Sequence, residues 1–252
     1  MYGVLVIGAP GAGKSTFCGG LADIFEQINR PFVTINLDPA NDSVLYQVDC
    51  DIKEMITVED VMDRLGLGPN GALRYCIDTL YKYLIIDCPG QLELYKSEGE
   101  LWKLIHDLER DGVRLCAVHL VDSLYCADAA KFISVVMSTL ATMVTMEMPQ
   151  VNVLSKVDLF DEDASFSLDY FTHLPDVNRL LELLNDVPGL ERYHGMNAAI
   201  CDVVTSFDLV SFVPLNVQKK EDMAKVLRLA DSANGFAFHE QKDIREMVLK
   251  ED

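Results

Sequence analysis

The feature that most restricts the fold of this chain is a glycine-rich segment near its start. Residues 8–15 read GAPGAGKS and match the pattern G-x-x-x-x-G-K-[ST]. Residues 2–7 before the segment form an apolar run, and residues 15–29 after it carry apolar side chains at helical spacing. A strand, a glycine-rich turn and a helix in this order are typical of a P-loop. In that structure, backbone N–H groups and the positive end of a helix surround phosphate oxygens.

The segment also predicts individual contacts to a nucleoside triphosphate. We expect Lys14 to reach the β and γ oxygens, Ser15 to coordinate Mg²⁺ and Thr16 to contact the α-phosphate. The backbone N–H groups that curl around the phosphates are those of Gly11, Ala12 and Gly13. The alternative is a glycine-rich turn with an incidental lysine, and the flanking strand and helix argue against it.

Apolar runs alternate with helical patterns along most of the chain. Strands are predicted at residues 31–36, 81–86, 114–121, 150–154 and 207–213, and helices at 57–65, 98–110, 127–145 and 221–233. Strands that are apolar on both faces and alternate with helices indicate a parallel sheet with right-handed crossovers. We therefore predict an α/β fold with a doubly wound, mostly parallel sheet.

The domain organisation is predicted to be simple. No repeat, low-complexity segment or linker interrupts the 252 residues, so we expect one domain over residues 1–252. Residues 161–205 are longer and less regular and are interpreted as a helical insertion. Residues 238–252 form a charged tail that we expect to be peripheral.

Composition restricts the partners and the compartment. The net charge of −19 argues against direct nucleic-acid binding, which requires a basic face. The apolar runs are far shorter than the roughly 20 residues that span a bilayer, so no membrane association is expected. Seven cysteines without a C-x-x-C pair indicate reduced thiols, and we predict a cytoplasmic location with shuttling to the nucleus.

A second motif follows the predicted strand at residues 81–86 and reads DCPGQ. Asp87 stands at the carboxyl end of that strand, where open α/β sheets bind ligands, and we expect it to hold Mg²⁺ directly or through water. The N–H of Gly90 can meet the γ-phosphate, and Gln91 can orient the attacking water. The alternative is a capped turn with a surface glutamine.

Asp38 ends the second predicted strand and precedes Pro39. Because a proline biases the preceding residue toward an extended conformation, the carboxylate of Asp38 should point off the edge of the sheet. We assign Asp38 to water positioning or proton acceptance. A simple turn aspartate remains the alternative.

A third motif, SKVD, follows the buried strand at residues 150–154. It resembles the [NT]-K-x-D guanine motif, with Ser155 in place of the usual asparagine. There Asp158 would accept two hydrogen bonds from guanine, which adenine does not offer, and the stem of Lys156 would lie over the ring. Pro214 and Leu215 follow the last predicted strand and are candidates for closing the base pocket. The alternative is a polar strand-to-helix loop.

In chain order, GAPGAGKST, NLDPAND, LGPNG, DCPGQ, LVDS, LSKVD and SFVPLN resemble the motifs of the GPN-loop GTPases, and within that family its eukaryotic type-two members. The resemblance implies a P-loop NTPase fold of the SIMIBI class, GTP as substrate, GDP as product and Mg²⁺ as cofactor. It also implies a homodimer or a heterodimer with a GPN-loop paralogue. The implied role is RNA polymerase II assembly and nuclear import, with polymerase subunits or assembly chaperones as partners.

The resemblance gives a role to the turn Gly68-Pro69-Asn70. A proline-fixed reversal could carry the Asn70 amide to a partner's γ-phosphate, where an arginine finger acts in other enzymes. An amide stabilises the charge less than a guanidinium does, so slow turnover is predicted. A local turn between two helices is the alternative for this tripeptide. For the whole chain the alternatives are a P-loop nucleoside or polynucleotide kinase and a nucleotide-bound scaffold that does not hydrolyse.

Overall fold

The computed structural model describes residues 1–39, 41, 44–53, 83–95, 99–127, 129–159, 181–182, 184–185, 191–206 and 210–238. The predicted helix at 57–65, the turn Gly68-Pro69-Asn70 and the tail beyond residue 238 lie outside these residues. Most of the predicted insertion also lies outside them.

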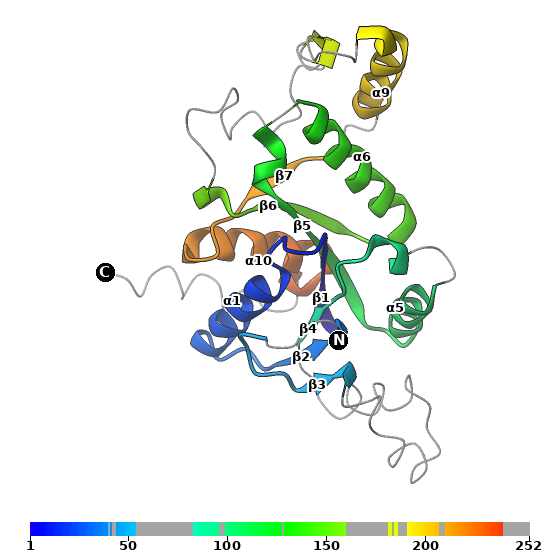
Figure 1. Cartoon of the computed structure of the whole chain (residues 1–252). Coiled ribbons are helices and arrows are strands. Elements are labelled where there is room, and N and C mark those ends of the chain that lie inside the picture. Colours follow the sequence, from blue (N-terminus) through cyan, green and yellow to red (C-terminus); the bar gives the residue numbers. More distant parts are fainter. Residues whose placement is uncertain are drawn as a thin grey trace.

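The centre of the molecule is a parallel sheet, which has seven strands in the described part of the chain. The strands are β1 (Tyr2–Gly8), β2 (Phe32–Asn36), β3 (Cys50–Asp51), β4 (Tyr83–Asp87), β5 (Arg114–Asp122), β6 (Gln150–Ser155) and β7 (Phe212–Pro214). Their order is β3-β2-β4-β1-β5-β6-β7, and every pair is parallel. The carboxyl ends of all the strands therefore lie along one edge of the sheet, with β1 between β4 and β5 (Figure 1).

Helices cover both faces of the sheet. On one face pack α1 (Lys14–Gln27) and α10 (Lys220–Asn234), through side chains such as Phe17 and Val226. On the other face pack α5 (Glu100–Arg110) and α6 (Ala129–Met146), and α9 (His194–Ser206) lies beside α6 (Figure 1). The predicted doubly wound α/β fold is confirmed. No described helix is long and apolar enough to cross a bilayer.

Short 3₁₀ helices complete the described elements. They are η1 (Leu92–Tyr95), η2 (Ser123–Ala127), η3 (Val157–Leu159), η4 (Glu191–Tyr193) and η5 (Phe236–Phe238).

The structure corrects some predicted boundaries. The last strand was expected at residues 207–213, of which 207–209 lie outside the described residues. In the described part β7 begins at Phe212 and ends at Pro214, because pairing with β6 occurs at these three positions. An apolar pattern marks burial, and it does not tell where a neighbouring strand begins to pair. The two-residue strand β3 was not predicted, since so short a segment carries no periodicity. Within residues 161–205 the structure describes the helix α9 from His194 onward, and most of the other residues of this stretch lie outside the described part.

Candidate nucleotide-binding site

The P-loop joins β1 to α1 and adopts backbone conformations that need glycine. Gly11 has φ 78° and Gly13, the residue before α1, has φ 90°. No heavy atom lies within 4 Å of a Cβ built on either residue. These two positions are therefore glycine because of their left-handed backbone and not for lack of space. The loop that results leaves Gly11 exposed at the head of the helix.

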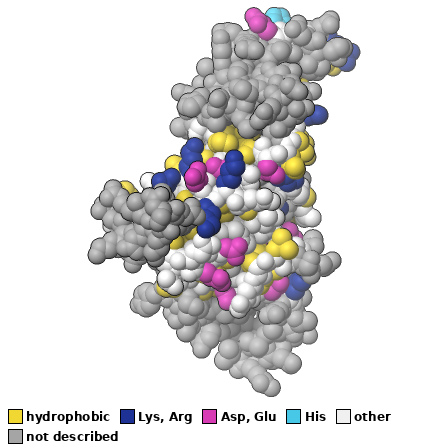
Figure 2. All heavy atoms as spheres, turned by 90° about the vertical axis from the view of Figure 1, so that its left-hand side faces the viewer, with side chains coloured by type: hydrophobic (Ala, Val, Ile, Leu, Met, Phe, Trp, Pro, Cys, Tyr) yellow, Lys and Arg dark blue, Asp and Glu magenta, His cyan; other side chains and the backbone are white. Residues whose placement is uncertain are grey.

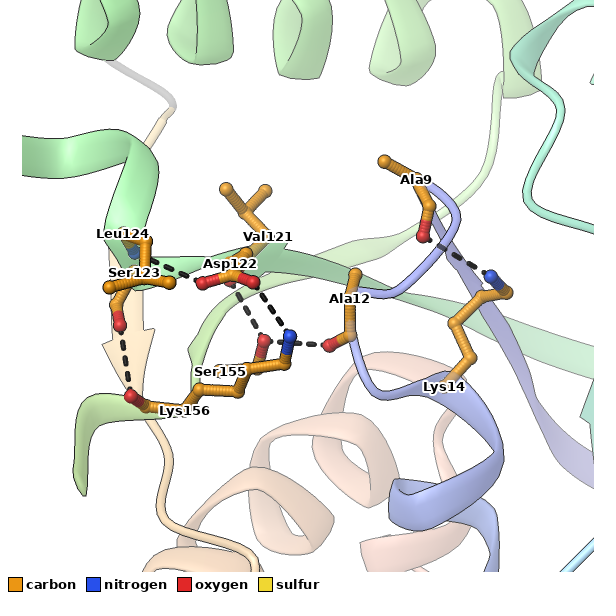
Figure 3. Close-up of polar contacts among 9 residues, drawn as sticks. All are labelled: Ala9, Ala12, Lys14, Val121, Asp122, Ser123, Leu124, Ser155 and Lys156. Carbon is orange, nitrogen blue, oxygen red and sulfur yellow. Dashed lines mark hydrogen bonds and ion pairs between the residues drawn. The ribbon is translucent and has the colours of Figure 1, made fainter. Parts of the chain in front are cut away.

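Lys14 lies across this loop. Its side chain is buried, and Nζ donates a hydrogen bond to the Ala9 carbonyl at 3.3 Å (Figure 3). The start of α1 adds about half a positive charge at the same point. Ser15 is half-buried and Thr16 is exposed on the first turn of the helix. The arrangement offers an ammonium and a helix N-terminus to a phosphate chain.

Asp87 lies next to the P-loop because β4 pairs with β1, with Asp87 in register with Val6. The side chain is almost fully buried, and Oδ2 accepts a hydrogen bond from the Tyr46 hydroxyl at 3.0 Å. Oδ1 is buried without a hydrogen-bond partner. Burial raises the pKa of Asp87, whereas the Ser15 and Tyr46 hydroxyls and the charge of Lys14 act in the opposite direction.

These features fit a Mg²⁺ ion bound together with nucleotide. The orphaned Oδ1 of Asp87 is a buried oxygen that a cation would satisfy. The Ser15 hydroxyl accepts a hydrogen bond from Asn41 at 2.7 Å, and its oxygen is a second candidate ligand for the cation at the head of α1. No described group of three or more His, Cys, Asp or Glu side chains could hold a metal. Mg²⁺ commonly uses one or two protein oxygens and completes its shell with phosphates and water.

Gly90 brings the loop after β4 into direct contact with the P-loop. A Cβ on Gly90 would lie 2.7 Å from the Pro10 nitrogen and 3.0 Å from Lys14 Nζ. Gly90 is therefore required by close approach of two backbones. Gln91 follows it with an exposed side chain. Asp38 is half-buried, and its charge contributes to the raised pKa of Asp87, so its carboxylate lies near the same strand ends.

The loop after β6 lies beside the P-loop at the carboxyl ends of the strands. The Ser155 hydroxyl lies 2.7 Å from the Ala12 carbonyl and 3.1 Å from that of Val121 (Figure 3). The Ser155 hydroxyl thus links the loop after β6 to the P-loop. Asp158 is exposed in η3.

The segment after β7 supports the same loop through its backbone. The N–H of Leu215 bonds the Leu154 carbonyl at 2.8 Å, and the Leu215 carbonyl accepts from Val157 at 3.4 Å. The Leu215 side chain is fully buried in the core, so its part in the site is a backbone one. Pro214 ends β7 and is half-buried.

Comparison with known proteins shows which sequences and which fold this chain resembles. The profile of a family described as "Conserved hypothetical ATP binding protein" matches residues 6–236. The chain is 42% identical to GPN-loop GTPase 2 from Danio rerio, covering 98% of this chain and 86% of the relative. It is 37% identical to GPN-loop GTPase QQT1 from Arabidopsis thaliana, covering 94% of this chain and 86% of the relative.

The chain belongs to the GPN-loop GTPase family. A solved structure, the apo form of a GTPase from Pyrococcus abyssi, superposes with a TM-score of 0.68 at 24% identity. The superposition covers 92% of this chain and 97% of the Pyrococcus abyssi chain. At that identity the likeness shows the fold, and the fold agrees with the expected P-loop architecture.

Within this GPN-loop GTPase, several side chains at the site were not predicted to act there. Asn41 contacts Ser15, Tyr46 contacts Asp87, and Asp122 contacts Lys156. Asn41 and Asp122 belong to the NLDPAND and LVDS runs, whose polar residues follow buried strands, and that position was a usable signal. Tyr46 carries no such signal. It reaches Asp87 because Thr34 in β2 holds the segment before β3 through the Gln47 carbonyl at 2.6 Å.

Proposed function

We propose that this chain is a Mg²⁺-dependent GTPase that converts GTP to GDP and phosphate. The observation that carries the proposal is the buried Asp87 carboxylate, which has an unsatisfied oxygen beside Ser15 and faces the loop that carries Lys14. When bound, Mg²⁺ would neutralise charge on the phosphate oxygens. Lys14 and the P-loop N–H groups would hold the phosphates, and Gln91 and Asp38 would orient the water and accept its proton.

Guanine is favoured over adenine, although the family description mentions ATP. The exposed carboxylate of Asp158 belongs to the loop that Ser155 ties to the P-loop through the Ala12 carbonyl. Guanine offers two donors to such a carboxylate and adenine offers none. The names of the relatives, GPN-loop GTPase, point to the same base.

The catalytic part of the proposal is tested with Gln91→Ala. We expect GTP affinity to stay nearly unchanged and phosphate release to fall by roughly a hundredfold or more, because the variant loses only the group that orients water. Binding of a fluorescent GTP analogue and single-turnover phosphate release separate the two quantities. Hydrolysis at the parent rate would remove Gln91 from the mechanism, and transfer of phosphate to an acceptor would favour a kinase.

The proposal extends to a dimer, and this part rests on the family resemblance. Each Gly68-Pro69-Asn70 turn would enter the neighbour's site, in a homodimer or a heterodimer with a paralogue. Light scattering after size exclusion, with GDP and with GDP plus aluminium fluoride, measures the mass directly. We expect closure to a dimer with the transition-state mimic, and a monomer in both states would contradict it.

The cellular part of the proposal is assembly and import of RNA polymerase II, by a protein that is cytoplasmic and shuttles to the nucleus. Polymerase subunits or their assembly chaperones would be the clients. Affinity purification of the tagged chain in the GTP-locked Gln91→Ala form should enrich them over the parent chain. Equal recovery with both forms would argue against a nucleotide-controlled grip.

A further inference from the structure

Two side chains at the end of β5 hold Lys156 at both of its ends. The Asp122 carboxylate lies 2.7 Å from Lys156 Nζ, and the Ser123 hydroxyl donates to the Lys156 carbonyl at 3.0 Å (Figure 3). The ion pair is partly sheltered, with side-chain exposures of 34% for Lys156 and 13% for Asp122. Parallel pairing of β5 with β6 creates this contact, since Asp122 is in register with Ser155.

The backbone of Lys156 is also constrained. Its φ is 59°, in the left-handed region that a lysine rarely adopts. A non-glycine residue stays there only when its surroundings hold it. The Ser123 hydroxyl on the carbonyl of Lys156 and the Leu215 carbonyl on the next N–H provide that support.

The Asp122 carboxylate is itself fixed. Its second oxygen, Oδ1, accepts a hydrogen bond from the Leu124 backbone N–H at 3.0 Å, at the start of η2 (Figure 3). Both oxygens of Asp122 are therefore engaged, one by backbone and one by the ammonium. A carboxylate whose own orientation is fixed can hold the Lys156 ammonium in one place. A freely rotating carboxylate would instead move with the ammonium.

We propose that Asp122 is a positioning residue for the nucleotide base, acting through Lys156. By holding the ammonium, it places the aliphatic stem of Lys156 where the face of the guanine ring will lie. The inference rests on the proposed function, because it takes residues 155–158 as the base-binding loop. An unrestrained lysine loses rotamer freedom when it packs on a ligand, and this loss weakens binding. The ion pair already restricts the Lys156 side chain in the folded protein, so nucleotide binding does not have to restrict it again.

The test compares Asp122→Asn with the parent chain, using GDP labelled with N-methylanthraniloyl on its ribose as the probe. Asparagine keeps the acceptor for Leu124 and the size of the side chain, and it removes the charge that holds Lys156. We expect GDP affinity to fall about tenfold and KM for GTP to rise by a similar factor, with kcat nearly unchanged. Asp23→Asn, an exposed position on α1, controls for the change in net charge and should bind as the parent does.

A double-mutant cycle shows whether Asp122 acts through Lys156. Lys156→Met keeps the aliphatic stem and removes the ammonium, so it should weaken GDP binding by about the same factor as Asp122→Asn. In the Lys156→Met background, Asp122→Asn should change the affinity less than about twofold. Fully additive effects, or parent-like affinity of Asp122→Asn, would overturn the inference. Should Asp122→Asn fail to fold, parent-like affinity of Lys156→Met would overturn it as well.

A separate variant distinguishes this inference from the base assignment itself. Asp158→Asn should lower the preference for GDP over ADP if residues 155–158 bind guanine. An unchanged preference in Asp158→Asn means that the proposed base site is wrong. A relaxed preference in Asp158→Asn, together with parent-like GDP affinity in Asp122→Asn, means that only the role of Asp122 is wrong.

Discussion

Glycines at the site meet two different physical requirements. Gly13 is needed for a left-handed backbone, and a Cβ there would meet no heavy atom within 4 Å. Gly90 is needed for space, because a Cβ would collide with the Pro10 backbone. The motifs containing both glycines were recognised in the sequence, but only the packing separates the two reasons. The distinction matters because a substitution at Gly13 would strain the backbone of that residue, whereas one at Gly90 would push two segments apart.

Gly90→Ala tests the close approach at the residue scale. The added methyl must push the P-loop away from β4, since its nearest neighbour is backbone and cannot rotate aside. We expect a loss of roughly 1–3 kcal/mol in unfolding free energy and a clear loss of nucleotide affinity. Urea unfolding and titration with fluorescent GDP measure the two. Gly195→Ala on α9, where no heavy atom lies within 4 Å, is the control and should lower neither quantity.

At the scale of elements, α10 is attached to the segment between α1 and β2 by a buried ion pair. Arg30, between α1 and β2, pairs with Asp231 in α10 at 2.9 Å, with side-chain exposures of 3% and 1%. The Arg30 guanidinium also lies 4.3 Å from the ring centre of Phe236 and 4.8 Å from that of Phe25. Because both charges are buried away from water, each of them stabilises the fold only when the other is present.

Asp231→Asn should therefore be strongly destabilising. It leaves the Arg30 charge buried without its counterion, which costs about 3–5 kcal/mol. Asp107→Asn breaks an ion pair with Arg110 whose side chains are 49% and 79% exposed, and it should cost about 0–1 kcal/mol. Chemical denaturation of both variants compares the two pairs. Similar losses in both would mean that burial does not set the strength of the α10 attachment.

At the scale of the whole molecule, stability should depend on pH through opposing effects. The chain carries a net charge of −19, and both signs of charge are interspersed on the described part of the face in Figure 2. Acidification relieves the self-repulsion of the excess carboxylates. Against this, His119 in β5 is buried with Nδ1 unpartnered, and desolvation lowers its pKa to about 4.

The sign of the His119 effect follows from proton binding. Between about pH 6.5 and 4 the unfolded chain protonates this histidine and the folded chain does not, so stability falls as pH falls. Between pH 7 and 4.5 the parent should lose about 2 kcal/mol more than His119→Gln, which has no titrating group there. Urea unfolding at both pH values gives the difference, which also removes the shared effect of the carboxylates. Equal losses in the two proteins would show that His119 is solvated or paired.

Much of the site was predictable because its motifs are local. Asp87, Gly90 and Gln91 follow one strand, and parallel topology places the end of that strand beside the P-loop. Contacts between distant residues were not predictable in this way. Tyr46 lies 41 residues from Asp87, and Asp122 lies 34 from Lys156. Neither pair belongs to a spacing pattern, so only the folded chain brings them together.

The amino-acid sequence alone determined the order of strands and helices, the glycine-rich loop and the residue types at the strand ends, because periodicity and turn chemistry act over a few neighbouring residues. The tertiary structure decided which side chains touch across the edge of the sheet. It oriented Asp87 toward Ser15, placed the Leu215 side chain in the core and paired Asp122 with Lys156. Those contacts depend on strand register and on burial, and both are properties of the packed sheet as a whole.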